Sequence, residues 1–64
     1  MRFDFAQFRE DARTRITNRR DLATSCGVTY QRINQWLRGD SNPSLDLTLG
    51  LCKALGMDVW RYYK

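Results

Sequence analysis

The sequence predicts an all-α fold, a compact bundle of about five short helices within one domain that spans residues 1–64. Apolar residues recur at intervals of three and four, which is the spacing of one helix face. No segment alternates with a period of two strongly enough to predict a strand. The 64 residues, 42% of them hydrophobic, suffice for one small core.

Two helices are expected in the first part of the chain. Residues 4–15 are predicted to form an amphipathic helix with Asp4 as its N-cap. Its apolar face consists of Phe5, Phe8, Ala12 and Ile16. A second helix is predicted to begin after the N-cap residue Asn18 and to end at Gly27, with Leu22 and Ala23 facing inward.

The third predicted helix follows after a short turn. Thr29 is its expected N-cap, and it runs to about Arg38, just before Gly39. Ile33 and Trp36, three residues apart, are its expected buried side chains. Residues 39–43 are rich in turn-forming types and are therefore predicted to form a loop.

A fourth helix is predicted after the N-cap residue Ser44, and Gly56 ends it. Its expected inward residues are Leu45, Leu49, Cys52 and Leu55. Gly50 within this helix lowers its propensity by about 1 kcal/mol. A final turn or two is expected from Asp58 through Val59 and Tyr62.

The positive charge of the chain lies in its N-terminal part. Residues 1–38 contain eight arginines and four acidic residues, whereas residues 39–64 are neutral, so the first part carries the whole net charge of +4. One-sided basicity indicates a polyanionic partner, and a solvated face is the alternative explanation. No apolar run approaches the roughly 18 residues of a membrane span, and no secretory signal is visible. We therefore expect a cytoplasmic protein that does not bind membranes.

The sequence offers little that could support catalysis or metal binding. It lacks histidine, a glycine-rich phosphate loop and clustered catalytic carboxylates, so we expect no enzyme. The spacing of Cys26 and Cys52 fits no zinc site. We therefore expect no metal and no cofactor, and we expect both cysteines to be small buried thiols.

The turn between the second and third helices carries the most informative motif. Cys26-Gly27-Val28 is too short for anything but a steep crossing of the two helices. Further marker residues are Leu22-Ala23, Thr29, Ile33, Trp36, Gly39, Asn42-Pro43-Ser44-Leu45 and Ala54-Leu55-Gly56. With these residues in register, residues 18–62 resemble the helix-turn-helix of the phage Cro and C-repressor (XRE-like) family. The resemblance implies a lambda-repressor-like domain that binds double-stranded DNA.

In that family the third helix lies in the major groove and contacts base edges. The resemblance places four candidate base-reading residues in this helix: Tyr30, Gln31, Asn34 and Gln35. Glutamine and asparagine suit this role because a planar amide can bond adenine N6 and N7 together. The alternative is that these polar side chains are ordinary surface residues.

A second set of residues is expected to contact DNA phosphates. Arg19 and Arg20 occupy the start of the second helix, where the helix dipole is unfavourable for cations, and a docked phosphate would reverse that penalty. The family likewise contacts the DNA backbone at this helix start. The remaining candidates lie in or just after the third helix: Thr29, Arg32, Arg38, Ser41 and Asn42.

Two further expectations concern contacts between helices and between chains. Many family members carry a glutamate just after the Trp36 position, paired with an arginine of the first helix. Here these positions are Leu37 and Ala12, so the resemblance predicts an apolar contact instead. Trp60 and Tyr63 are large, three residues apart and not needed for the core, so we expect them at a dimer interface.

Three functions remain open from the sequence. The first is a transcriptional repressor that binds a palindromic operator as a homodimer, because one such domain offers few contacts on its own. The second is an antitoxin, which would bind a toxin protein and its own promoter. The third is the N-terminal part of a longer repressor.

Overall fold

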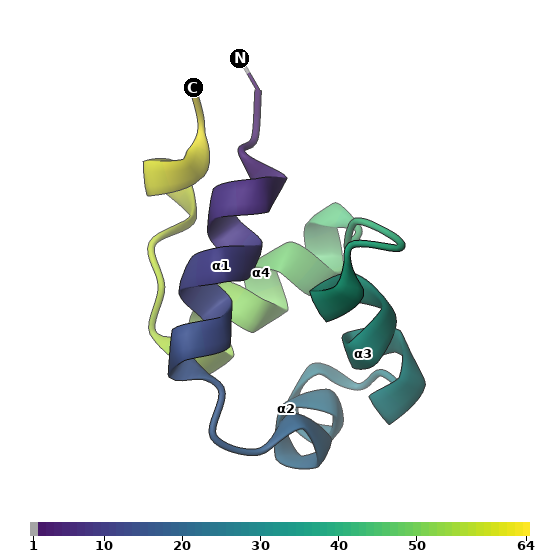
Figure 1. Ribbon diagram of the computed structural model, residues 1–64. Coiled ribbons are helices and arrows are strands. Elements are labelled where there is room, and N and C mark those ends of the chain that lie inside the picture. Colours follow the sequence, from purple (N-terminus) through teal and green to yellow (C-terminus); the bar gives the residue numbers. More distant parts are fainter. Residues whose placement is uncertain (1) are drawn as a thin grey trace.

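The computed structural model describes residues 2–64 as an assembly of short helices. Its elements in chain order are α1 (Phe5–Arg15), α2 (Arg19–Cys26), α3 (Tyr30–Arg38), α4 (Leu45–Leu55) and the 3-10 helix η1 (Val59–Tyr62) (Figure 1). The all-α prediction is confirmed in outline. The count of five helices is slightly wrong, because the fifth element is a single short 3-10 helix.

The predicted caps set the helix boundaries. The side chains of the four predicted N-cap residues, and of Asp58 where the final turn was expected to begin, each accept a hydrogen bond from a backbone N–H of the following turn: Asp4, Asn18, Thr29, Ser44 and Asp58. The glycines that end α2, α3 and α4 all adopt the left-handed conformation, which other residues rarely adopt. Each helix therefore begins and ends where local sequence alone predicts it.

The core lies where the four α-helices and η1 meet. Phe8, Ile33, Trp36, Leu37 and Leu51 are its largest fully buried side chains. The rings of Phe8 and Trp36 pack against each other with their centroids 5.6 Å apart. The predicted inward residues Ala12, Leu22 and Ala23 are also buried.

Helix α4 shows the predicted inward face only in part, because Cys52 is buried and Leu55 half-buried but Leu45 and Leu49 are exposed. Its buried residues are Leu47, Thr48, Leu51 and Cys52. Leu45 and Leu49, both expected to face inward, are 63% and 47% exposed. Helix α4 packs against α2 near Gly50, where the Cys26 sulfur lies 4.0 Å from the position that a Cβ would take. This packing leaves the Leu45–Leu49 side of α4 in solvent.

The two ends of the described chain lie side by side (Figure 1). Phe3 and Tyr63 form an isolated antiparallel β-bridge. Backbone hydrogen bonds flank it, from the Asp4 N–H to the Tyr62 carbonyl at 2.6 Å and from the Lys64 N–H to the Arg2 carbonyl at 2.7 Å. This pairing was not predicted, and it fixes η1 against α1.

Tyr62 joins η1 to α1 through its side chain. Its ring is buried, as expected, and its hydroxyl donates to the Asp11 carboxylate at 2.6 Å. Burial and this hydrogen bond raise the pKa of Tyr62 to about 12. The same hydrogen bond, with one from Gln7, holds the pKa of Asp11 below its usual value. Val59 is half-buried against the core.

The cysteine prediction is correct for one residue only. Both thiols are free, but Cys52 is buried whereas Cys26, the last residue of α2, is half-buried. Loss of solvent raises the pKa of both thiols, so neither is activated as a nucleophile. No helix among residues 2–64 has the length and apolar character needed to cross a membrane.

Candidate nucleic-acid interface

The α2–turn–α3 unit positions the candidate interface. The left-handed Gly27, with φ of 70°, reverses the chain direction after α2. The Val28 N–H then donates to the Ala23 carbonyl at 3.0 Å, which ties the turn to the helix before it. As a result α3 packs against α2 and presents one long side outward (Figure 1).

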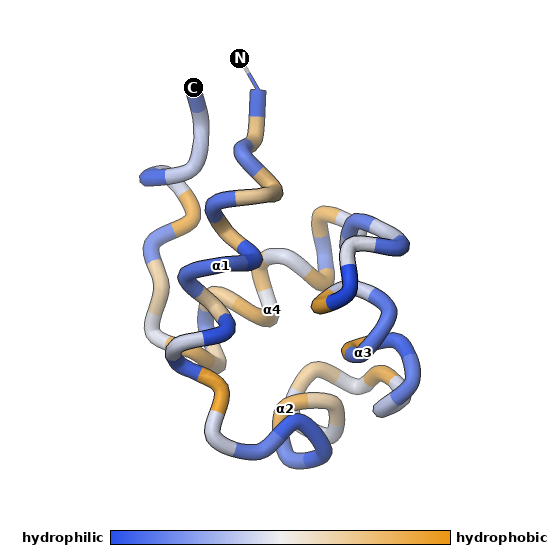
Figure 2. The backbone as a smooth tube through the Cα atoms, in the orientation of Figure 1, coloured by the Kyte–Doolittle hydropathy of each residue, from blue (hydrophilic) through white to orange (hydrophobic). Residues whose placement is uncertain are grey.

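Helix α3 is strongly two-sided. Ile33, Trp36 and Leu37 are buried, and the remaining residues are polar apart from the Tyr30 ring. Figure 2 shows hydrophilic residues along its outer side and at the start of α2. The predicted burial of Ile33 and Trp36 is therefore confirmed, and the polar side of α3 faces solvent.

The four candidate base-reading residues form two adjacent stripes on α3. Gln31 and Gln35 are one helical turn apart, as are Tyr30 and Asn34. Tyr30 and Gln31 are exposed, whereas Asn34 and Gln35 are half-buried. Side chains from both stripes can reach a ligand that lies along α3.

Arg19 and Arg20 do not stand free in solvent. Arg19 Nη1 donates to Asn34 Oδ1 at 2.8 Å. The Arg20 guanidinium lies over the Tyr30 ring, 4.3 Å from its centroid, in a cation–π contact. The start of α2 is thus fastened to the outer side of α3.

The backbone at the start of α2 differs from the expected anion site. The Asn18 side chain already accepts hydrogen bonds from the N–H groups of Arg20 and Asp21. A phosphate at this point would therefore meet the arginine side chains, with two of the helix-end amides already bonded.

The other candidate phosphate-binding residues are arranged around α3. Arg38 pairs with Asp40, with Nε 3.0 Å from Oδ2. Ser41 and Asn42 are exposed in the loop that follows, next to the buried Pro43. This loop therefore presents two polar side chains beside the end of α3.

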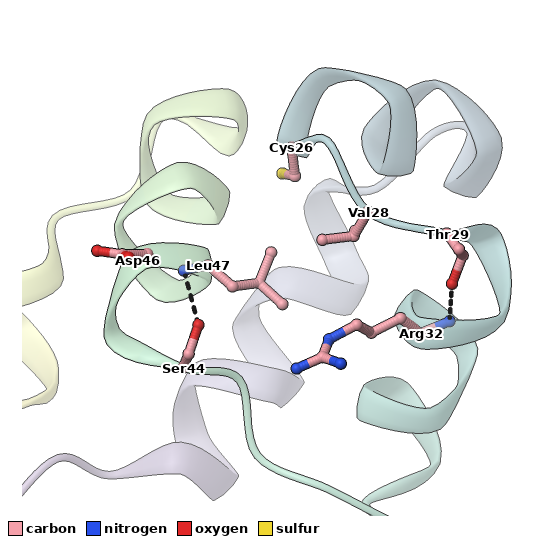
Figure 3. Close-up of a pocket in the computed structure, with 7 residues that line it drawn as sticks. All are labelled: Cys26, Val28, Thr29, Arg32, Ser44, Asp46 and Leu47. Carbon is pink, nitrogen blue, oxygen red and sulfur yellow. Dashed lines mark hydrogen bonds between the residues drawn. The ribbon is translucent and has the colours of Figure 1, made fainter.

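Thr29 and Arg32 lie at the other end of the helix. The Thr29 hydroxyl accepts a hydrogen bond from the Arg32 N–H at 3.1 Å and so serves as the α3 cap. The Arg32 side chain extends along an open hollow toward Ser44 and Leu47 of the next helix (Figure 3). In this conformation the guanidinium points toward α4.

Arginines of α1 play a role that the sequence analysis missed. Arg13 donates to the Leu37 carbonyl at the end of α3. Arg15 donates to the Leu55 and Gly56 carbonyls at the end of α4, at 3.3 and 3.4 Å. Cations at helix C-termini complement the helix dipole. Two of the eight arginines in residues 1–38 therefore stabilise helix ends.

The expected apolar replacement of an ion pair is also visible here. Ala12 and Leu37 are both buried in the same core cluster, and no ion pair is possible between them. Arg13, the neighbour of Ala12, instead reaches the Leu37 main-chain carbonyl. An α1 arginine thus still contacts this part of α3, through the backbone.

The candidate dimer residues lie away from α3, on η1 and the C-terminal segment. Trp60 is 71% exposed, and its ring packs against Tyr63 with the centroids 5.5 Å apart. Tyr63 is half-buried because its ring also packs edge-on against Phe3, at 5.2 Å. Trp60 is therefore the available side chain of the pair.

No cluster of three or more potential metal ligands occurs among residues 2–64.

A family model described as helix-turn-helix matches residues 8–59, which is most of the chain. No curated protein and no solved structure shows a significant match. The match includes the turn at Gly27, the whole of α3 and the loop after it. The chain therefore belongs to the Cro/C-repressor-type (XRE-like) helix-turn-helix family of regulators, which bind double-stranded DNA.

Proposed function

We propose that this protein is a sequence-specific transcriptional regulator that contacts base edges through the outer side of α3. The observation that supports this most directly is the polar, solvent-facing stripe of Gln31 and Gln35 on a helix whose opposite side is fully buried. Such a helix can enter a major groove without exposing its core residues. We assign the phosphate contacts to six residues: Arg20, Thr29 at the start of α3, Arg32, Arg38 and the loop residues Ser41 and Asn42.

We further propose that the regulator binds a palindromic operator as a homodimer. A single α3 covers only a few base pairs, and two-fold pairing doubles the number of contacts. Trp60 is a large exposed aromatic residue held in place by Tyr63, and aromatic residues are enriched in protein interfaces. This surface is the best-supported site for self-association.

The first experiment is a selection of bound sequences from random double-stranded DNA. An enriched palindrome supports both the reading role and the dimer. The enriched sequence then serves as the operator in titrations of Gln31→Ala and Gln35→Ala. Each substitution is expected to cost about 1–3 kcal/mol on the operator and much less on random DNA, since random sequences lack the specific contact.

Two control variants separate base contacts from phosphate contacts. Arg38→Ala is expected to weaken operator and random DNA about equally and to reduce the salt slope by about one unit. Gln7→Ala makes the same side-chain truncation on α1, away from α3, and is expected to change neither affinity. If the Gln31 and Gln35 variants lose operator and random DNA in equal proportion, α3 is not the reading helix.

An antitoxin is the second candidate, and one observation favours it. Leu45 and Leu49, one turn apart on α4, are both exposed, which gives the helix an apolar surface without a partner in the monomer. Replacing both with Ser would abolish toxin binding in an antitoxin but leave operator binding intact. If neither the α3 variants nor Arg38→Ala affects any DNA, DNA binding through α3 is refuted, and binding of a protein partner through Leu45 and Leu49 becomes the function to test.

A further inference from the structure

The contact between Arg19 and Asn34 joins two residues that the sequence assigns to different tasks. Arg19 is the first residue of α2, and Asn34 lies in the middle of α3. Their side chains meet at 2.8 Å on the outside of the molecule. The hydrogen bond is charge-assisted, which makes it stronger than a bond between neutral groups.

The chemistry of the pair fixes how the Asn34 amide points. A guanidinium group carries only donors, so the atom that faces Arg19 must be the amide oxygen. The amide nitrogen of Asn34 therefore points away from Arg19. Turning the amide over would bring its NH₂ group against the guanidinium and break the bond.

The two side chains together then present donors to the groove. The Asn34 amide offers its NH₂ group, and Arg19 keeps the guanidinium N–H groups that the bond does not use. Guanine presents two acceptors in the major groove, O6 and N7. Adenine presents one acceptor and one donor, so its N6 needs an acceptor from the protein. A free asparagine can supply that acceptor. Here one lone pair of the Asn34 oxygen is already used by Arg19, and the positive guanidinium beside it disfavours the approach of a second donor such as adenine N6 but attracts the acceptors of guanine.

We infer that Arg19 is a specificity-determining residue that orients Asn34 to read guanine in place of adenine. This inference rests on the proposed function, because it requires α3 to lie in the major groove. It assigns to Arg19 a role beyond neutralising a phosphate. Arg19 would thereby make Asn34 prefer guanine, whereas a free asparagine would favour adenine.

The test begins with the same selection from random DNA, carried out in parallel on the wild type and Asn34→Ala. The base pair whose preference disappears in Asn34→Ala is the one that Asn34 reads. The wild type is expected to prefer guanine there. In Arg19→Met the preference is expected to move toward adenine, by roughly fivefold or more, the low end of discrimination by one base-edge contact.

The double variant Arg19→Met/Asn34→Ala separates the orientation of Asn34 by Arg19 from the general attraction of DNA by the Arg19 charge. In the Asn34→Ala background, Arg19→Met should no longer alter the preference at that base pair. Arg38→Met removes one positive charge elsewhere and is expected to weaken all sequences equally, with the base preference unchanged. Thermal unfolding by circular dichroism verifies that each variant is folded, and Arg19→Ala serves as a second replacement.

Several results would overturn the inference while leaving the proposed function in place. One is an adenine preference of the wild type at the Asn34-dependent base pair. Another is an Arg19→Met variant that weakens every sequence by the same factor. A third is an Asn34→Ala variant that loses preference at no base pair. A selection that enriches no sequence at all would instead count against the proposed function.

Discussion

Replacing Trp36 provides the most direct test of how α3 is packed. The side chain is 1% exposed and packs against the fully buried Phe8. Truncation to alanine removes the whole indole ring and leaves a cavity at the centre of the core, which costs about 3–5 kcal/mol. A single core in so small a domain rarely supplies more than about 3–5 kcal/mol of stability. Trp36→Ala is therefore expected to unfold most of the population at 25 °C.

Trp36→Phe is the matched variant. The indole Nε1–H is buried and has no hydrogen-bond partner among the described residues. An unpaired buried donor costs about 1–3 kcal/mol, and phenylalanine removes it. This gain offsets part of the lost packing, so we expect Trp36→Phe to cost less than about 2 kcal/mol.

The assay is urea unfolding followed by far-ultraviolet circular dichroism, which reports helix content without depending on a tryptophan. The wild type and Trp36→Phe should show cooperative transitions at different midpoints. Trp36→Ala should show little helix even without urea. A loss below 1 kcal/mol for Trp36→Ala would mean that α3 is rotated and that Trp36 is not in the core.

The remaining predictions concern the C-terminal segment and its contact with α1. Trp60→Ser should weaken self-association in sedimentation experiments without changing thermal stability, whereas Tyr63→Ser should also lower stability because its ring packs on Phe3. An unchanged monomer–dimer equilibrium in Trp60→Ser would place the interface elsewhere. The raised pKa of Tyr62 implies that its contribution to stability is complete below pH 10 and declines as the pH rises toward 12. The lowered pKa of Asp11 implies that its contribution to stability is lost as the pH falls and the carboxylate becomes protonated. Tyr62→Phe should flatten the alkaline decline, and a decline of unchanged size would assign it to other groups.

Helix boundaries could be predicted because they depend on neighbours in the chain. Asn18 accepts from N–H groups two and three residues ahead, and Thr29 accepts from one three residues ahead. Gly27 and Gly39 end helices because they tolerate positive φ. None of these features requires knowledge of the rest of the fold. The same locality explains why the turn at Gly27, together with the marker residues in register as far as Gly56, could indicate the family.

The face of α4 could not be predicted in this way. Leucines occupy positions 45, 47, 49 and 51, so a helical period yields two stripes of nearly equal apolar character. The choice between them depends on where α2 packs, and α2 packs at Gly50. The bridge between Phe3 and Tyr63 was invisible for a related reason, because backbone pairing between distant residues leaves no periodic pattern.

The roles of the arginines were the other part that sequence could not resolve. Their number indicated a polyanionic partner, but charge alone does not distinguish a DNA contact from a bond to a helix end. Arg13 and Arg15 have tertiary partners 24 and 40 residues away in sequence. They are already engaged with helix carbonyls, so the net charge of the chain overstates the number of phosphates it can neutralise. We therefore expect a shallower salt dependence than eight arginines would suggest.

The same contacts have a consequence for recognition. Helix α3 is fixed at its C-terminal end by Arg13, and its outer side is joined to α2 through Arg19 and Arg20. Side chains that are already ordered lose less conformational entropy when they bind. Asn34 and Tyr30, the two proposed reading residues with partners, would therefore meet DNA in a restricted set of orientations. Gln31 and Gln35 make no side-chain hydrogen bond within residues 2–64, so under the proposed function the DNA itself would order them, and a mismatch at their base pairs should be better tolerated than one opposite Asn34.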